Sequence, residues 1–443
     1  KESYIRKVVV NEEQRFIDTL DTGLRILGEE VALLKKEGRQ VIPGDVVFKL
    51  YDTFGFPVDL TADIVRKDGL TLDMEGFEAA MEAQREKARE SWKGSGEQAV
   101  ADSYKKLSVR GVTTAFIGYH GVTEAAAVVT AILKKDAEVE ELVAGENGEI
   151  FVDETPFYGE KGGQVGDTGV IAGDGYLFEV WDTQCPTDTL ITHIGKMKEG
   201  KIRVGDTVQL RVDETSRRAT EAHHSGTHVL NAALKKVLGD HIKQAGSSVT
   251  PERFRFDFTH FSRIEAEELD AIENIANEYI RRNAEVNTRV LPKEEAMKTG
   301  AAAVFDEKYS DNVRVVKMGD FSMELCGGTH VNRTGDIGAL KVVGESAVAA
   351  GVRRIEAVTG GEAIKYFKAV EAELKKSAGL LRANPLEVTE RIDRILKHQR
   401  DLEREIETLK GKLAARDSAD LIGRAREIKG VKVLATVVEA PDV

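Results

Sequence analysis

Apolar residues change their spacing several times along the chain, and these changes divide it into segments. From Glu12 to Lys36 they recur three or four positions apart, which predicts an amphipathic helix that Gly38 ends. Residues 1–97 predict helices throughout. From about residue 107 to residue 212, short runs alternate apolar and polar side chains between glycine turns, which is typical of a small antiparallel β-barrel.

A long helix is the next predicted element. It is expected from Ser216 to Leu238, with a cap near Asp213 or Thr215 and a stop at Gly239. Helices and strands then alternate to about residue 360, which predicts an α+β segment.

Two helical stripes follow, separated by the Ala-Asn-Pro break at residues 383–385. Apolar residues in strict three-four spacing predict an antiparallel helical hairpin with a coiled-coil seam, in which Gln399 is a polar position. The last run, residues 431–440, resembles a lone strand that begins a further domain. The fold class is therefore multidomain α+β, with five expected segments: a helical segment (1–100), a β-barrel (101–213), an α+β domain (214–360), a helical hairpin (361–417) and the start of a truncated domain (418–443).

Composition narrows the class of protein. The 443 residues are too many for one core, and 41% hydrophobic with 31% charged residues is typical of a soluble globular protein. No apolar run approaches membrane-spanning length and no signal peptide opens the chain, so no membrane contact is expected. Two cysteines make no disulfide framework, which predicts a cytoplasmic protein.

The net charge of −13 argues against indiscriminate coating of nucleic acid. Local basic pairs could still bind RNA: Arg217–Arg218, Arg281–Arg282 and Arg353–Arg354.

Two short motifs carry the clearest chemistry. HHSGTH (223–228) and CGGTH (326–330) together offer His224, His228, Cys326 and His330. On a helix, an i, i+4 pair places both imidazoles on one face. Three imidazoles and one thiolate match the preference of zinc for tetrahedral nitrogen and sulfur ligands. The alternative is a solvated pair of histidines and a small buried cysteine.

Two further features have both a structural and a functional interpretation. The glycine-rich run at residues 155–169 is either a barrel hairpin loop or a loop that a substrate approaches closely, with Gly162 and Gly163 in it and Gln164 as its polar tip. Asp59 or Thr61 could cap the helix that begins near them, and a cap is the simplest interpretation of Asp59. The functional interpretation of Asp59 is a contact to RNA.

The motifs LYDTFGFPVDLTAD, TPFYGEKGGQVGDTG, HHSGTH, QAGSSVTPERFRFDF, GDFSMELCGGTH, RTGDIG and GVRRIEAVTG occur in the order found in bacterial alanyl-tRNA synthetases. The chain resembles the middle and C-terminal part of that family, with nothing of its class II aminoacylation domain. The resemblance implies an editing activity that hydrolyses Ser-tRNA(Ala) and Gly-tRNA(Ala) at a zinc site, without aminoacylation. It implies one zinc per chain on His224, His228, Cys326 and His330, with ATP and magnesium needed only by the full-length enzyme.

The same resemblance implies roles for single residues. Editing would depend on Gln244 and Cys326 as catalytic positions, and Gln244 is expected in a polar loop before a strand. The partner would be tRNA(Ala), held by its acceptor stem and 3′ end, with Asp59, Arg353 and Arg354 as contacts.

Alternatives stay open at this point. Zinc could supply hydroxide if one ligand is loose, hold the substrate amino group, or be structural. The chain could instead be a free-standing trans-editing deacylase, or a non-catalytic tRNA-binding module with structural zinc. The seam of the hairpin could be buried within the chain or against a second copy in a homodimer.

Overall fold

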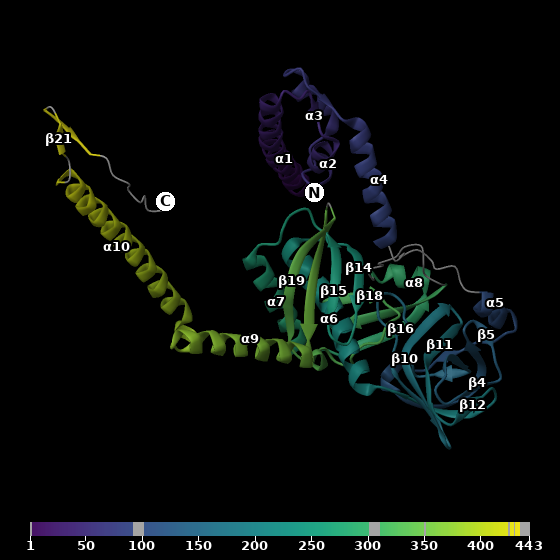
Figure 1. Cartoon of the computed structure of the whole chain (residues 1–443). Coiled ribbons are helices and arrows are strands. Elements are labelled where there is room, and N and C mark those ends of the chain that lie inside the picture. Colours follow the sequence, from purple (N-terminus) through teal and green to yellow (C-terminus); the bar gives the residue numbers. More distant parts are fainter. Residues whose placement is uncertain are drawn as a thin grey trace. The chain divides into compact units, whose positions relative to one another are not determined.

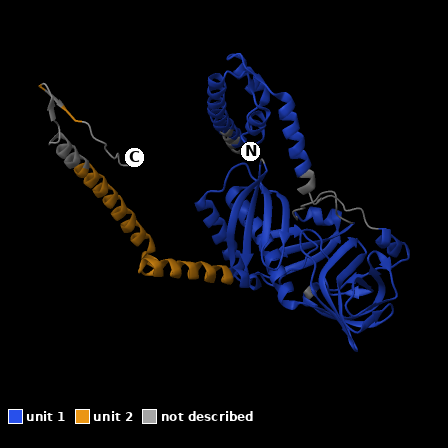
Figure 2. Cartoon of the chain, viewed as in Figure 1, with its two compact units in different colours: residues 1–363 blue, residues 364–443 orange. Residues whose placement is uncertain are grey.

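The structure is a computed structural model, and its contacts divide the chain into two units, residues 1–363 and 364–443 (Figure 2). It describes residues 2–91, 102–300, 311–349, 351–423, 426–428 and 430–434. The polar run KGSGEQ at residues 93–98, whose composition predicts a linker, lies outside these ranges. Among the described helices, none is both long and apolar enough to cross a membrane.

Four helices form the first part of the chain (Figure 1): α1 (Glu2–Glu37), α2 (Gly44–Asp52), α3 (Val58–Arg66) and α4 (Met74–Ser91). Strands β1 (Val41–Ile42) and β2 (Thr71–Leu72) pair beside them. The helix α1 begins well before Glu12, and Gly38 follows its end with a positive φ of 71°. Buried Leu27 and Leu34 of α1 pack with Leu50 and Phe56, so the apolar spacing does mark the packed face.

Six antiparallel strands close the predicted barrel. Its ring consists of β4 (Glu124–Lys134), β7 (Asn147–Val152), β11 (Leu190–Glu199), β10 (Tyr176–Thr187), β9 (Gly169–Gly173) and β13 (Thr207–Val212), which pairs again with β4. Side chains alternate inward and outward along β13, with Val208, Leu210 and Val212 buried. The smaller elements around the ring are α5 (Asp102–Val109), β3 (Ala115–Phe116), η1 (Tyr119–Gly121), β5 (Ala137–Glu138), β6 (Glu141–Val143), β8 (Glu154–Thr155) and β12 (Lys201–Arg203).

The α+β domain is built on α6 (Glu214–Leu238), whose ends agree with the prediction. Asp213 caps it by accepting from the backbone N–H groups of Thr215 and Ser216, and Gly239 follows it with a φ of 112°. Asp213 is therefore the cap, and Thr215 is already inside the helix.

Two antiparallel sheets complete this domain. The first contains β14 (Gln244–Val249), β15 (Phe254–Thr259), β20 (Val352–Thr359) and β19 (Leu340–Ala349); the second contains β16 (Val286–Pro292), β17 (Asn312–Met318) and β18 (Ser322–Leu325). The remaining elements are α7 (Ala266–Arg281), α8 (Lys293–Lys298) and η2 (Thr334–Ile337). The helices α6 and α7 pack on the first sheet, whose buried Phe254, Phe256 and Phe258 meet them.

Arg217 joins the barrel to α6. Its side chain is fully buried; Nε lies 3.0 Å from both carboxylate oxygens of Asp167, and the terminal nitrogens donate to the carbonyl oxygens of Gly118 and Pro156. The expectation that Arg217 helps to bind RNA is wrong, because the buried guanidinium is paired inside the protein. Arg218, the next residue, is exposed and pairs with Glu214.

The C-terminal unit is helical: α9 (Gly360–Leu381) and α10 (Val388–Gly423) are separated by η3 (Pro385–Glu387) (Figure 1). The predicted seam of α10 remains exposed, with Ile406 52% and Leu409 50% exposed. The seam is therefore not packed against α9 in this structure, and its partner stays a prediction. The last run is not a lone strand, since β22 (Val431–Val433) pairs with β21 (Arg426–Ile428).

The buried ion pair generates a first prediction. Replacing Arg217 with Met leaves the Asp167 carboxylate buried without its cation, so we expect a loss of about 3 to 5 kcal/mol in the free energy of unfolding. Urea denaturation, followed through spectroscopic signals of the barrel and α6, measures this free energy of unfolding. The matched control is Arg218→Met, which removes an exposed pair and should cost less than about 1 kcal/mol. Equal losses in the two variants would contradict a special role for Arg217.

Candidate metal centre

The four predicted ligands lie together. One nitrogen or sulfur atom from each of His224, His228, Cys326 and His330 lies within 4.8 Å of the others. The two α6 histidines stack nearly in parallel, with ring centroids 5.5 Å apart. Cys326 follows β18, and its Sγ lies 3.3 Å from Nε2 of both His224 and His330. The fold therefore brings together two segments that are about a hundred positions apart.

Each imidazole is held by its outer nitrogen. Nδ1 of His228 lies 2.8 Å from Glu324 Oε2, Nδ1 of His224 lies 2.6 Å from Gln164 Oε1, and Nδ1 of His330 lies 3.2 Å from Ser225 Oγ. Partners of this kind orient histidines that bind metals and leave the other ring nitrogen for the ion.

The inner nitrogen of His228 tests whether a metal fits. His228 is buried, yet its Nε2 has no hydrogen-bond partner among the described residues. A buried polar atom without a partner costs about 1 to 3 kcal/mol, and a bound cation would satisfy it. The donor set of three nitrogens and one sulfur also fits zinc. Four protein ligands make a closed set, which is typical of structural zinc, because no position is left for water.

Charge within the cluster also suits a cation. Burial opposes ionisation of the Cys326 thiol, but the neighbouring His224 and His330 imidazoles hold its pKa well below the usual range. Burial lowers the pKa of His330 to about 3, so this ring is neutral. Burial likewise disfavours a charged His228, but Glu324 outweighs it and raises the pKa of His228 to about 10. Zinc would displace that proton, since a metal ligand must present a free lone pair.

Gly328 allows the ligands to approach one another. A Cβ at this position would lie 2.1 Å from His224 Cε1 and 2.7 Å from Gln164 Oε1. Any side chain would therefore push apart the ring and the amide that holds it.

The other histidine of the HHSGTH motif has a structural role. Nε2 of His223 accepts from the backbone N–H of Thr359, and Nδ1 lies 2.8 Å from the carbonyl oxygen of Thr250. His223 thus faces the first sheet, not the metal cluster.

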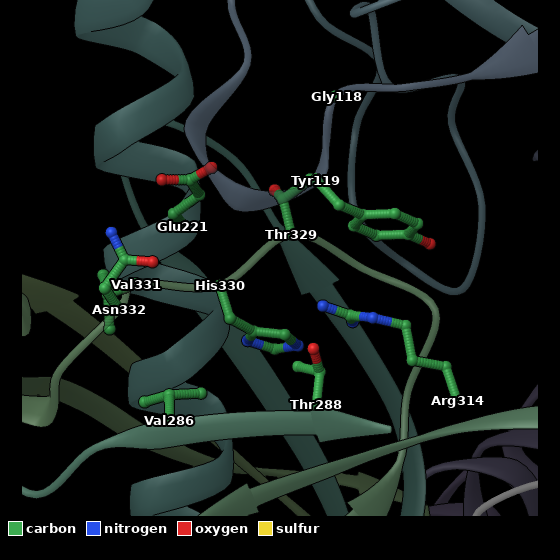
Figure 3. A pocket seen from close by; sticks show the side chains of 10 residues that line it. All are labelled: Gly118, Tyr119, Glu221, Val286, Thr288, Arg314, Thr329, His330, Val331 and Asn332. Atoms are coloured by element: carbon green, nitrogen blue, oxygen red, sulfur yellow. The ribbon is translucent and has the colours of Figure 1, made fainter. Parts of the chain in front are cut away.

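A small polar cavity of about 30 Å³ lies beside His330 (Figure 3). It is lined by Gly118, Tyr119, Glu221, Val286, Thr288, Arg314, Thr329, His330, Val331 and Asn332. This volume is enough to admit water, which needs at least about 10 to 15 Å³. Burial raises the pKa of Glu221 to about 7, so its carboxyl can hold or release a proton near neutral pH.

Two cavity residues fix the loop that carries Cys326. The Tyr119 hydroxyl donates to the Gly327 carbonyl at 2.8 Å. Arg314 donates to the carbonyl oxygens of Cys326 at 3.1 Å and Gly328 at 2.7 Å, and its guanidinium lies 4.3 Å from the Tyr119 ring centroid. The barrel, through Tyr119, therefore touches the ligand loop directly.

Gln244 differs from its expected setting. It is the first residue of β14, not a loop residue, and is half-buried. Its amide donates to Ser247 Oγ at 3.0 Å, and Ser247 in turn packs against Gly163. Gln244 thus reaches the neighbourhood of the metal centre through intermediate residues, and its catalytic role stays a prediction.

Gln164 is not the exposed tip of its loop. Its side chain is fully buried and contacts His224 and Thr329, while Gly162 and Gly163 turn the chain with φ of 64° and 87°. The polar tip expected from the sequence points inward because the loop docks on the α+β domain. Contact of this loop with a substrate stays a prediction.

The predicted RNA contacts are dispersed. Asp59 is exposed in the first turn of α3, but it is not the cap, which is Pro57. Nor is Thr61 the cap, since it lies within α3. Arg354 pairs with Asp257 through bonds of 2.6 and 2.8 Å, and Arg353 pairs with Glu345. Their charges are thereby largely neutralised, and tRNA contact by all three residues stays a prediction.

Sequence reasoning missed the residues around the ligands. Glu324 stands two positions before Cys326 at the end of a strand, and strand alternation places such residues on one face. Ser225 lies inside HHSGTH itself. For Arg314 and Tyr119, no local pattern gave a signal, because their partners are distant in sequence.

Comparisons with known proteins bear on the whole chain. Residues 1–216 match the family described as tRNA synthetases class II (A), and residues 313–356 match the threonyl and alanyl tRNA synthetase second additional domain. The alanine–tRNA ligase of Methylococcus capsulatus is 49% identical over 431 residues, which cover 97% of this chain and 49% of that ligase. The alanine–tRNA ligase of Carboxydothermus hydrogenoformans is 46% identical over 443 residues, covering 100% of this chain and 51% of the relative. The chain thus spans about half the length of these curated relatives.

These matches correct part of the sequence-based expectation. Residues 1–216 match class II (A) synthetases. The expectation that the chain holds nothing of the class II region is therefore wrong. So is the expectation that it is only the middle and C-terminal part of the family. The expected editing fragment without aminoacylation is overturned by the same match. By sequence, the chain is similar to alanine–tRNA ligases along nearly all of its length, and its first 216 residues match the class II (A) synthetases.

Proposed function

We propose that this chain is a segment of an alanine–tRNA ligase, and that the whole ligase attaches alanine to tRNA(Ala) with ATP and magnesium. The similarity to alanine–tRNA ligases over 97% to 100% of the chain supports this, as does the class II match of residues 1–216. Alanine attachment is proposed for the whole protein, because the chain spans about half of its relatives. Its proposed location is the cytoplasm, where a thiolate ligand stays reduced.

Within this ligase, His224, His228, Cys326 and His330 bind one zinc ion. The observation that carries this step is the convergence of three imidazole nitrogens and one thiolate, with the buried His228 Nε2 left without a hydrogen-bond partner in the described part of the chain. A closed set of four ligands suits an ion that orders the site by joining α6 to the loop after β18. When bound, zinc supplies positive charge at the thiolate and the inner imidazole nitrogens. The chain's own residues, Glu324 and Arg314 among them, hold the ligands in place.

The proposed partner is tRNA(Ala), with its acceptor stem on residues 1–100 and its 3′ end beside the metal centre. The polar cavity beside His330 supports the second contact, since Thr288, Asn332 and Glu221 offer it hydrogen-bonding groups (Figure 3). The exposed position of Asp59 supports the first. A second copy of the chain is the proposed partner for the exposed seam of α10.

Alanine attachment by the whole ligase tests the main proposal. With ATP, magnesium and tRNA(Ala), the full-length protein should form alanyl-tRNA, measured as acid-insoluble labelled alanine. Omission of ATP is the control and should abolish the product. A full-length protein that charges a different amino acid, or none, would overturn the proposal.

Metal content is a separate prediction. Protein purified without chelator should contain one zinc per chain, measured by elemental analysis, and His224→Ala should contain much less because a ligand is lost. His223→Ala is the matched control: it removes a neighbouring buried imidazole that faces the sheet, so zinc should be retained. Equal zinc in the parent and His224→Ala would refute the ligand assignment.

Binding of tRNA(Ala) should depend on salt. If the chain contacts phosphates through local basic groups, its affinity falls steeply between about 50 and 200 mM salt, as is general for such contacts. Filter binding at several salt concentrations measures the slope. A flat dependence would show that phosphates contribute little to the contact.

A further inference from the structure

Gln164 is the barrel residue that contacts a candidate ligand side chain, His224, whereas Tyr119 contacts the backbone of the ligand loop. Gln164 lies in the loop between β8 and β9 and is fully buried. Its Oε1 is 2.6 Å from His224 Nδ1 and accepts from the backbone N–H of Thr329 at 3.0 Å. Its Nε2 donates to the Thr329 hydroxyl at 2.9 Å. All the polar atoms of this amide therefore contact the ligand His224 or the residue before the ligand His330.

These contacts set the protonation pattern of His224. The Thr329 N–H identifies the atom facing His224 as the amide oxygen, and an amide oxygen only accepts hydrogen bonds. His224 Nδ1 therefore carries the proton and donates to Gln164. Its Nε2 faces Cys326 Sγ at 3.3 Å, on the side of the ring that would meet a metal ion.

The loop that carries Gln164 is fastened to the metal-binding domain, not only to the barrel. The backbone N–H of Val249 donates to the Gly163 carbonyl at 2.7 Å, and the N–H of Val165 donates to the Val249 carbonyl at 3.1 Å. Gly163 allows this approach, because a Cβ there would lie 2.5 Å from the Ser247 carbonyl oxygen.

The other two histidines are held from within their own domain. Glu324 of β18 holds His228, and Ser225 of α6 holds His330. Of the contacts that the described residues make to these three outer nitrogens, the one from Gln164 comes from the barrel. Without the barrel, the site would therefore lack the outer hydrogen bond to His224.

We propose that Gln164 is a positioning residue that makes metal binding depend on the docked barrel, so that zinc and the seating of the loop at residues 155–169 stabilise each other. The inference rests on the proposed zinc site. Reciprocity follows from linkage: if the docked loop raises the affinity for zinc by some factor, zinc stabilises the docked loop by the same factor.

Two substitutions separate orientation from packing. Gln164→Leu keeps the volume but removes the acceptor, so His224 loses its partner, and zinc affinity should fall about 10- to 100-fold, the usual effect of losing such a partner. Gln164→Glu keeps an acceptor for Nδ1 and should restore affinity to near the parental value. Competition with a chromophoric chelator measures affinity, and the visible absorption of the cobalt-substituted protein reports ligand geometry. Gln209→Leu is the matched control, the same change at an exposed position of the barrel strand β13, where Gln209 pairs with Ala126 and Ala172.

Hydrogen exchange of the parent tests the coupling without any substitution. Adding zinc to the metal-free protein should slow exchange at the backbone N–H groups of Gln164, Val165 and Val249. In Gln164→Leu, zinc should slow these sites much less.

The outcomes are distinguishable. If the parent binds no zinc, the proposed metal site fails, and the inference fails with it. If Gln164→Leu binds zinc as tightly as the parent, with the same cobalt spectrum, the metal site stands and the positioning role of Gln164 is refuted. Unchanged exchange in the loop of the parent would refute the coupling alone.

Discussion

The buried contact between Arg217 of α6 and Asp167 of the barrel loop is the interaction on which the candidate site depends. It joins the barrel to the α+β domain near the start of α6. His224 lies about two turns further along the same helix. A buried ion pair stabilises little by itself, because desolvation of both groups offsets much of their attraction. Its main effect is to specify one arrangement, since any displacement of the loop would leave both charges buried and unpaired.

That arrangement explains why the loop at residues 155–169 has its unusual composition. Asp167 holds Arg217, Gln164 holds His224, and Gly163 lets the backbone lie against β14. One loop thus fastens α6 at two points about two turns apart. The result is a candidate metal centre whose four possible ligands come from one domain and whose outer hydrogen bonds come from two.

The cluster itself balances opposing effects of burial. Burial disfavours a thiolate at Cys326 and a charged His228, yet each is stabilised by a neighbour: the imidazoles for the thiolate, and Glu324 for the imidazolium. Nε2 of His228 finds no hydrogen-bond partner in the ranges that the structure describes, so this nitrogen remains unsatisfied. A cation at the centre of the cluster resolves it, because all the inner donors then share one partner.

The sequence by itself determined the elements and the ligand types. Apolar spacing and capping residues located α6 from Asp213 to Gly239, and the period of two located the barrel, because both signals are local. The HxxxH and CxxxH spacings likewise pointed to four candidate ligands, which the fold brings together, since a helix or tight turn brings i and i+4 together.

Only the tertiary structure decided which distant residues surround these ligands. Gln164 was expected at an exposed tip and Arg217 on an RNA surface, yet both are fully buried. The apolar residues of the α10 seam are exposed in the structure. Their regular spacing predicts a partner helix, but it does not identify which helix that is. The physical reason is that hydrophobic periodicity and capping act over a few residues. A hydrogen bond between positions 60 apart depends on how two folded domains dock, and no local pattern encodes that.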